Sequence, residues 1–290
     1  MIGNHLPTGD IVSFSKAVNA LRAFFLGRGF IEVHTQDRLS ILAACEDPYT
    51  VATYQYEGNC WPLPQTGQMW LEYELLTKPE LPGVFCVSTS YRNEPNPVPG
   101  RHERMFPMFE FEARGEFADL RVLEEDLCEH VGLGTRGAFH HATYADMATH
   151  YDVEELTSVE EKRMADDFGR VVFLERFPEH TSPFWNMRRG VDAAHKIDVI
   201  IDGMETIGSA ERSSDVDDMR KRFYSISDGG YAALLFEKFG KARVEKELEE
   251  FFSLPFFPRF GGGIGMTRVM RALKNTPGAV TASRQFAAVL

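Results

Sequence analysis

One loop of the chain is flanked by side chains that could bind a polyphosphate and a purine. Arg92 and Glu94 stand at the start of a segment rich in proline, and His102 and Phe106 follow it. Cations hold phosphates, an aromatic ring stacks on a purine, and a carboxylate can accept a hydrogen bond from the purine amino group. Two strands joined by this loop would place all four side chains around one cleft. Taken alone, such a hairpin is more often a solvated surface loop.

Two further segments carry groups with related chemistry. The run Gly-Gly-Gly-Ile-Gly at 261–265 precedes Arg268, and glycines let a strand approach a ligand whose phosphates the arginine can reach. A tight strand-to-helix bend is the alternative for that run. Asp198 and Glu205 could hold magnesium, which proteins usually bind through one or two carboxylates and substrate phosphates. An acidic pair at this spacing is commonly structural.

The positions of helices and strands follow from the apolar spacing around these segments. Helical spacing predicts helices over 14–29, 120–131 and 244–252, and β-forming residues predict strands over 30–35, 84–91, 105–112 and 196–201. Helices and strands come in blocks without regular βαβ alternation. The predicted fold class is therefore α+β, with a mainly antiparallel sheet flanked by helices in one domain, residues 1–290.

The composition describes an ordinary globular protein. Of 290 residues, 43% are hydrophobic and 26% are charged, enough apolar material for a sizeable core. The formal net charge of −12 argues against a large nucleic-acid footprint. No CxxC pair occurs among the four cysteines, which favours a reducing, cytoplasmic setting. No apolar run approaches the length of a membrane span, so no membrane partner is expected.

The order of these residues resembles that of the class II aminoacyl-tRNA synthetases. Tyr91-Arg-Asn-Glu, a variable loop, Arg101-His and then Phe106 resembles their second signature motif, especially in the lysine and asparagine enzymes. The resemblance implies that Arg92 binds the α-phosphate of ATP, Glu94 the adenine edge and His102 the terminal phosphates, while Phe106 stacks on adenine. The glycine run resembles the third motif, in which Arg268 would contact the γ-phosphate.

The expected amino-acid pocket also comes from this resemblance. The stretch from Asp198 to Glu205 resembles the magnesium- and ATP-binding stretch of aspartyl enzymes, and Arg212 would grip the substrate's side-chain carboxylate or amide. Segments around Glu46 and Gln68 resemble those of asparaginyl-tRNA synthetase that hold the α-amino end. The remaining expected substrate-binding residues are Glu72 and Glu110.

Two positions depart from the family pattern. Aspartyl enzymes have a lysine where this chain has Leu71, which favours a side-chain amide over a second negative charge. An acidic residue commonly precedes the third-motif arginine, but Thr267 stands here. In that feature the chain is more similar to ammonia-dependent asparagine synthetase A, which uses the same core. Leu71 favours asparagine as the substrate. Thr267 favours the other reading, in which the chain is similar to the ammonia-dependent synthetase.

A helix and strand from Phe24 to Gln36 resemble the first motif, which usually forms a homodimer interface, although Gln36 replaces the usual proline. An ordinary helix packed on a strand, without a dimer interface, explains this segment equally well.

The expected reaction is attack of an aspartate- or asparagine-type carboxylate on ATP, with Mg2+, to give an acyl-adenylate and pyrophosphate. About 15 residues precede the first motif, so an N-terminal anticodon-binding barrel is expected to be absent. Ammonia or another small amine is then the expected acyl acceptor. Two alternatives stay open. The chain could aminoacylate tRNA, or it could be a catalytically silent paralogue that serves as a tRNA-binding or regulatory module.

Overall fold

The computed structural model of the protein describes residues 10–276, apart from residues 36–38, 42–47, 99 and 182. The strands of the main sheet are β1 (Ile31–Glu32), β4 (Gly83–Tyr91), β5 (Met105–Arg114), β6 (His140–Thr143), β7 (Val171–Phe177), β8 (Ala194–Ile201), β9 (Met204–Arg212) and β10 (Arg259–Gly265). A separate hairpin consists of β2 (Thr53–Tyr56) and β3 (Asn59–Pro62). The helices are α1 (Ile11–Leu26), α2 (Gln68–Thr77), α3 (Phe117–His130), α4 (Tyr144–Tyr151), α5 (Ser158–Phe168), α6 (Val216–Ser225), α7 (Gly230–Phe239), α8 (Lys241–Phe252) and α9 (Met266–Lys274).

The main sheet has the strand order β1-β4-β5-β10-β9-β8-β7-β6. Neighbouring strands run antiparallel except at the two edges, where β1 pairs with β4 and β6 with β7 in parallel. This confirms the mainly antiparallel sheet flanked by helices. Within the described residues the main sheet has eight strands, with a short parallel strand at each edge.

The segments predicted from the sequence form as expected, with shifted ends. Helix α1 begins at Ile11 because the Asp10 side chain caps it by accepting a hydrogen bond from the Val12 amide. It ends before Gly29, whose φ of +79° suits glycine. The strand predicted over 30–35 is shorter than expected, since only Ile31 and Glu32 pair as a strand with β4. One more backbone hydrogen bond, from Val33 to Phe85, continues that edge.

Alternation along the strands gives the sheet two different faces. On one face, here called the back face, Phe25 of α1 packs against Phe85, Phe109 and Phe111, with ring centroids 5.2–5.7 Å apart. Helices α1, α3 and α9 cover this face together. The alternate residues of β5, among them Glu110 and Glu112, lie on the opposite front face. An apolar back and a polar front follow from the period of two.

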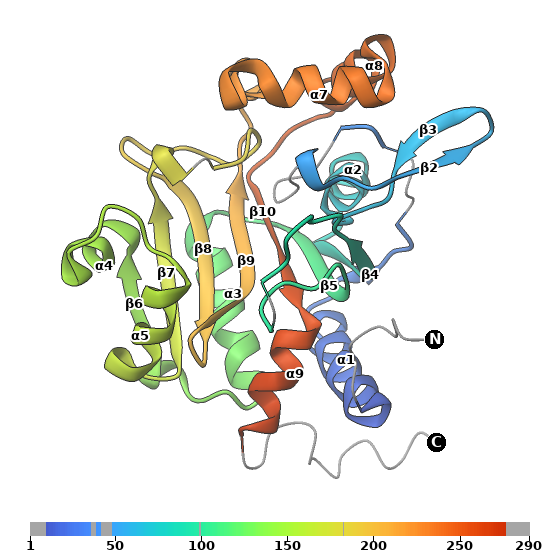
Figure 1. Cartoon of the computed structure of the whole chain (residues 1–290). Helices are drawn as coiled ribbons and strands as arrows, with labels where there is room; N and C mark the ends of the chain where they lie inside the picture. Colours follow the sequence, from blue (N-terminus) through green and yellow to red (C-terminus); the bar gives the residue numbers. More distant parts are fainter. Residues whose placement is uncertain (1–9, 36–38, 42–47, 99, 182, 277–290) are drawn as a thin grey trace.

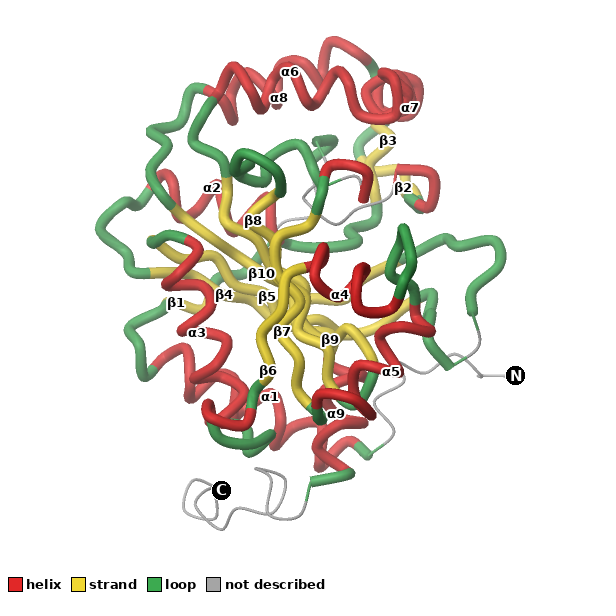
Figure 2. Tube along the Cα trace, turned by 90° about the vertical axis from the view of Figure 1, so that its left-hand side faces the viewer, coloured by secondary structure: helices red, strands yellow, loops and turns green. Residues whose placement is uncertain are grey.

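Three smaller clusters complete the core. Helix α2 packs on β4 at the front face, and α4 and α5 pack on the strands at the other edge. Helices α6, α7 and α8 form a layer above the front of the sheet (Figure 2), around the buried ring of Trp185. None of the helices in the described ranges is long and apolar enough to span a membrane.

One carboxyl group lies inside the apolar layer between α3 and the sheet. Glu124 is fully buried, and the Ser209 side chain of β9 offsets only part of the cost of burying its carboxyl. Burial raises the pKa of this carboxyl well above its usual range, with the nearby carboxylates of Asp198 and Glu175 adding to the effect. The folded protein therefore keeps this proton at pH values where the unfolded chain releases it.

This proton predicts a pH dependence of stability. Because the folded chain binds more protons than the unfolded chain, the Glu124 contribution to the free energy of unfolding is full below 4.5 and declines as the pH rises towards the raised pKa. We expect Glu124→Gln to remove this decline. Urea unfolding from about pH 5 to about pH 8 measures it. Glu129→Gln, on the exposed side of the same helix, is the control, and parallel pH profiles for the wild type and Glu124→Gln would contradict the assignment.

Candidate functional site

Two rows of residues cross the front face of the sheet and form the base of the site. The rows are Glu110, Gly263, Gly208 and Asp198, and Glu112, Gly261, Ala210 and Lys196, each running from β5 through β10 and β9 to β8. Both rows have small residues in the middle and charged residues at the ends. The small residues leave room above the sheet for the long side chains around them.

The glycine run of β10 is required by its neighbours. A Cβ atom at Gly261 would lie 1.9 Å from Oε1 of Glu112, and one at Gly263 would lie 2.7 Å from the Met108 side chain. Side chains at these positions would displace the buried carboxylate or fill the space beside Gln68. The run is thus a strand over which other side chains lie, with the helix α9 beginning at its end.

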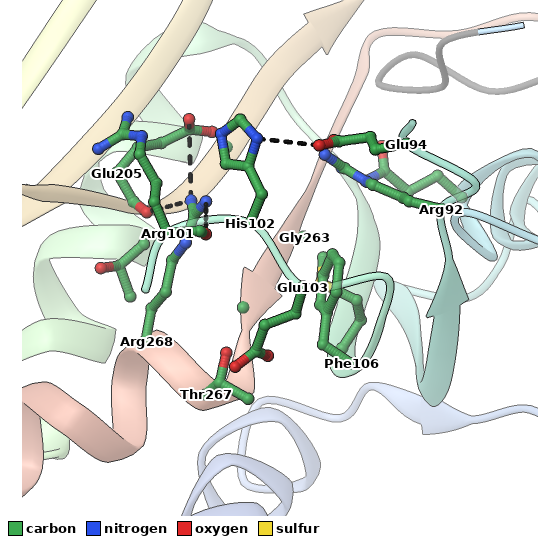
Figure 3. Close-up of a pocket in the computed structure, with 15 residues that line it drawn as sticks. Arg92, Glu94, Arg101, His102, Glu103, Phe106, Glu205, Gly263, Thr267 and Arg268 are labelled. Carbon is green, nitrogen blue, oxygen red and sulfur yellow. Dashed lines mark hydrogen bonds and ion pairs between the residues drawn. The ribbon is translucent and has the colours of Figure 1, made fainter. Parts of the chain in front are cut away.

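The β4–β5 hairpin supplies one wall of a cleft. The Arg92 amide donates to the Arg104 carbonyl at 2.7 Å, which continues the strand pairing beyond β4. The Arg92 guanidinium lies 5.3 Å from the centre of the Phe106 ring, and its buried Nε has no hydrogen-bond partner among the described residues. His102 Nδ1 and Glu94 Oε2 are 2.9 Å apart (Figure 3). The hairpin therefore presents cations and an aromatic face to the same space.

The opposite wall comes from β9 and α9. Arg268 donates to the backbone carbonyl of Glu205 at 2.5 Å and lies 3.9 Å from its carboxylate. Figure 3 shows this guanidinium between Glu205 and the loop that carries Arg101. Arg101 itself donates to Glu161 of α5 at 2.7 Å, and the other oxygen of Glu161 accepts from the Glu205 amide. These contacts fix the two walls to each other.

Seven predicted residues line this one cleft, which contains about 720 Å3 of empty space. They are Gln68, Arg92, Glu94, His102, Phe106, Glu205 and Arg268. Arg101, Glu103 and Thr267 line the cleft as well and were not among the predicted site residues, although Arg101 stands next to His102 in the motif.

Glu103 lies beside the unusual Thr267. Partial burial raises the pKa of the Glu103 carboxyl, and a hydrogen bond with Thr267 and the charge of Arg268 oppose that rise. A carboxylate from the loop thus stands next to the position where the family commonly has an acidic residue. Sequence order could not reveal this, because the two residues are far apart along the chain.

Asp198 and Glu205 approach each other above Gly208. A Cβ atom at Gly208 would lie 3.0 Å from a Glu205 oxygen and 3.6 Å from Asp198 Oδ1. Burial and the nearby Glu205 carboxylate raise the pKa of Asp198 to about 7, although Lys196, 2.6 Å from Oδ2, opposes the rise. Oδ1 is buried without a hydrogen-bond partner among the described residues. Two such oxygen donors fit a hard divalent cation that also binds phosphates.

A second pocket adjoins the cleft and shares Gln68, Glu205 and Gly208 with it. Its other lining residues are Thr181, Pro183, Phe184, Met187, Lys196, Ser209 and Arg212. Arg212 is the predicted side-chain anchor, and it is buried with hydrogen bonds to Glu112 at 2.5 Å and to Gln68 at 2.6 Å. Burial raises the pKa of Glu112 to about 7, and the Arg212 charge opposes that rise.

Two more predicted residues, Glu72 and Glu110, line neither pocket. Glu72 is buried below the pockets, where Arg259 donates to it at 2.6 Å and Asn186 at 2.5 Å. Glu110 accepts hydrogen bonds from the Gly67 amide and the Ser88 hydroxyl, and burial raises its pKa. It thereby holds the turn that leads into Gln68. Glu46 lies outside the described residues.

A family model described as tRNA synthetases class II (D, K and N) matches residues 10–279. No curated protein sequence matches the chain.

Among solved structures, asparaginyl-tRNA synthetase from Pyrococcus horikoshii complexed with asparaginyl-adenylate is similar, with a TM-score of 0.74 and 20% identity over 90% of this chain and 64% of that chain. The Entamoeba histolytica asparaginyl enzyme with the same adenylate gives 0.69 and 19%, over 90% of this chain and 62% of that one. Aspartyl tRNA synthetase from E. histolytica gives 0.67 and 18%, over 92% and 56%. The chain therefore spans less than two thirds of the length of these proteins.

The placement of Glu72 predicts a large effect on stability. Glu72→Ala leaves the buried Arg259 guanidinium without its carboxylate, so we expect the free energy of unfolding to fall by about 3–5 kcal/mol. Glu74→Ala on the same helix breaks only a more exposed pair with Lys78 and should cost less than about 1 kcal/mol. Chemical denaturation compares them, and equal small losses would show that Glu72 does not support the fold in this way.

Proposed function

Since the chain belongs to the class II tRNA synthetases of the D, K and N group, we propose that it activates an aspartate- or asparagine-type amino acid as an acyl-adenylate. One observation carries the proposal: Arg92, His102, Phe106 and Arg268 surround a single cleft that opens into the Arg212 pocket. A nucleotide and an amino acid bound in these two spaces would lie next to each other. The adenylate complexes of the two asparaginyl-tRNA synthetases support this arrangement.

In the proposed reaction, a carboxylate oxygen of the amino acid attacks the α-phosphorus of ATP, and the bond to the bridging oxygen of pyrophosphate breaks. Arg92 would stabilise the charge that develops on the α-phosphate, helped by its Nε, for which no described residue is a hydrogen-bond partner. His102 and Arg268 would hold the departing pyrophosphate, and Phe106 would stack on the adenine ring. Positioning and charge do the work, so no protein nucleophile takes part.

Magnesium would be held by Asp198 and Glu205, and when bound it would neutralise phosphate charge beside Arg268. Lys196 pairs with Asp198 at this site. The Lys196 ammonium partly neutralises the charge of the Asp198 carboxylate. In the part of the chain that the structure describes, no group of three or more His, Cys, Asp or Glu side chains could hold a metal. Magnesium at the proposed site would therefore need phosphate oxygens as further ligands.

For the second step, we propose transfer of the acyl group to ammonia or another small amine. The amine nitrogen attacks the acyl carbon, and AMP leaves with the former carboxylate oxygen. Thr267 in the third motif and the net charge of −12 support this acceptor. The family and the similar structures support aminoacylation of tRNA equally, so tRNA is the second candidate acceptor.

We propose a homodimer assembled through α1 and β1. Leu26 and Ile31 are 53% and 46% exposed there, and β1 is an edge strand only two residues long. Exposed apolar groups at a sheet edge suit pairing with a second chain. Gln36, which replaces the usual proline, lies outside the described residues. The free thiols of Cys60, Cys86 and Cys128 support a reducing, cytoplasmic setting.

Activation predicts pyrophosphate exchange into ATP that depends on an amino acid. We expect Arg92→Ala and Arg268→Ala to lower the exchange rate by at least about 100-fold, because each removes a charge-assisted contact to phosphate. Arg271→Ala, exposed on the same helix as Arg268, is the control. Absence of exchange with every standard amino acid, together with no ATP binding by calorimetry with magnesium, would favour the catalytically silent module instead.

The acceptor is identified by the product. With ATP, aspartate and ammonium at about their saturating concentrations, we expect an amide and AMP to accumulate together with catalytic turnover. Mass spectrometry of the small molecules measures it, and total tRNA with labelled amino acid is tested in parallel. Charged tRNA without free amide would reject the small-amine acceptor and keep the activation step.

A further inference from the structure

We infer that Glu161 of α5 is a positioning residue for the phosphate side of the cleft. This inference rests on the proposed activation reaction, and Glu161 lies outside the segments that resemble the family motifs. Its carboxylate closes a ring of hydrogen bonds that joins the loop between β4 and β5, the helix α9, the strand β9 and the helix α5. The four members of the ring are Arg101, Arg268, Glu205 and Glu161.

The ring consists of four contacts. Glu161 Oε1 accepts from Arg101 at 2.7 Å, and Oε2 accepts from the Glu205 amide at 3.1 Å. The Glu205 carbonyl accepts from Arg268 at 2.5 Å, and the Arg268 guanidinium makes a longer contact of 3.5 Å to the Arg101 carbonyl. The side chains of Glu161 and Arg101 are only 14% and 18% exposed, so little water competes for their ion pair. One carboxylate thus connects the two walls of the cleft.

The pairing of β9 with β10 stops short of Glu205. Only the residues from Ile207 to Arg212 have partners on β10, so Glu205 lies beyond the last pair on that side. Its amide and carbonyl meet the side chains of Glu161 and Arg268 instead of a strand, which satisfies both polar groups of this backbone. Because the backbone directs the side chain, these two contacts set the position of the Glu205 carboxylate.

The turn between β8 and β9 lies directly against α5. Gly203 in this turn has a φ of +77°, and a Cβ atom there would lie 2.9 Å from Cα of Lys162. Glycine is therefore required for the two backbones to approach this closely. Arg170 donates to Asp202 of the same turn at 2.8 Å and to a backbone carbonyl near the end of α9 at 2.9 Å. The start of β9 is thus packed against the turn of α5 that carries Glu161, and it is linked to α9.

The ring lies on the phosphate side of the cleft. Figure 3 shows Arg101, Glu205 and Arg268 on one side and Phe106 on the other. Arg268 would hold the leaving pyrophosphate and Glu205 the magnesium, whereas Phe106 would stack on adenine. Groups that are held in place before ATP arrives need less ordering when it binds. Removal of Glu161 should therefore weaken the binding of ligands that carry β- and γ-phosphates and have little effect on AMP.

The sign of the effect separates positioning from simple charge. Glu161 is a negative charge near the cleft, so Coulomb repulsion alone predicts that ATP binds more tightly after its removal. Positioning predicts the opposite. An amide at residue 161 offers one acceptor oxygen to two donors, so either Arg101 or the Glu205 amide then faces an NH2 group. One link between the walls is lost, and ATP has to order the phosphate side when it binds.

The experiment compares the wild type with Glu161→Gln and Glu161→Ala. Calorimetry with magnesium measures the affinities for ATP and AMP, and pyrophosphate exchange gives kcat/KM for ATP. We expect both variants to lose at least about tenfold in ATP affinity and in kcat/KM, and less than about twofold in AMP affinity. Hydrogen–deuterium exchange of the protein without nucleotide should become at least about threefold faster in segments 100–106 and 203–207. Asp166→Asn, at an exposed position of α5, is the control and should match the wild type.

Three outcomes would overturn the inference. These are an ATP affinity that is unchanged or higher in both variants, an equal loss for ATP and AMP, and unchanged hydrogen exchange in the two segments. Thermal melting checks that each variant is folded, and Glu161→Gln keeps a polar side chain if Glu161→Ala unfolds.

Failure of the proposed function gives a different result. If the wild type binds ATP but shows no pyrophosphate exchange with any amino acid, activation is rejected, and the affinities for ATP and AMP still decide the role of Glu161. If the wild type binds no ATP, the nucleotide site itself is rejected. Hydrogen exchange then still decides whether Glu161 joins the two walls.

Discussion

The front of the sheet depends on the ion pair between Arg212 and Glu112, which is buried directly above Gly261. Two charges removed from water destabilise a protein unless they meet each other and satisfy their remaining hydrogen bonds. The glycine makes this possible, since any side chain there would occupy the position of the carboxylate. A second buried pair, Glu72 with Arg259, lies beside it and leaves Arg212 close to both acids. The base of the pocket is thereby a compensated layer of charge.

This layer explains why the buried carboxyl groups of the core differ in their partners and in the balance between burial and charge that sets their pKa. Glu110 holds a turn, Glu112 holds an arginine, and Asp198 faces a lysine, so each has partners that favour its charged form against the cost of burial. Glu124 sits on the apolar side of the same sheet, where burial raises its pKa well above its usual range. The front face of the sheet thus gives its buried carboxyl groups polar and cationic partners, whereas Glu124 lies among the apolar residues of the back face.

The two departures from the family motifs acquire spatial counterparts in the fold. Beside Thr267 lies Glu103, supplied by the loop between β4 and β5. Lys196 of β8 lines the pocket, whereas Leu71 does not. An acidic substrate and transfer to an amine are chemically consistent, because amidation of one carboxylate of a dicarboxylic amino acid yields a side-chain amide or an α-carboxamide. The preference for asparagine that Leu71 indicates stays a prediction.

The order of residues along the chain predicted much of the fold and of the candidate site. The family, the mainly antiparallel sheet and the hairpin residues Arg92, Glu94, His102 and Phe106 were predictable, because neighbours in one motif stay neighbours on one hairpin. The edge strand β6 and the shortness of β1 were not predictable, because the pairing of an edge strand depends on which strand lies beside it. Glu72 looked like a pocket residue, yet it pairs with Arg259, 187 positions away along the chain. Lys196 and Glu103 carry no signal in sequence order, because their positions depend on strand register and loop packing, which only the tertiary structure decides.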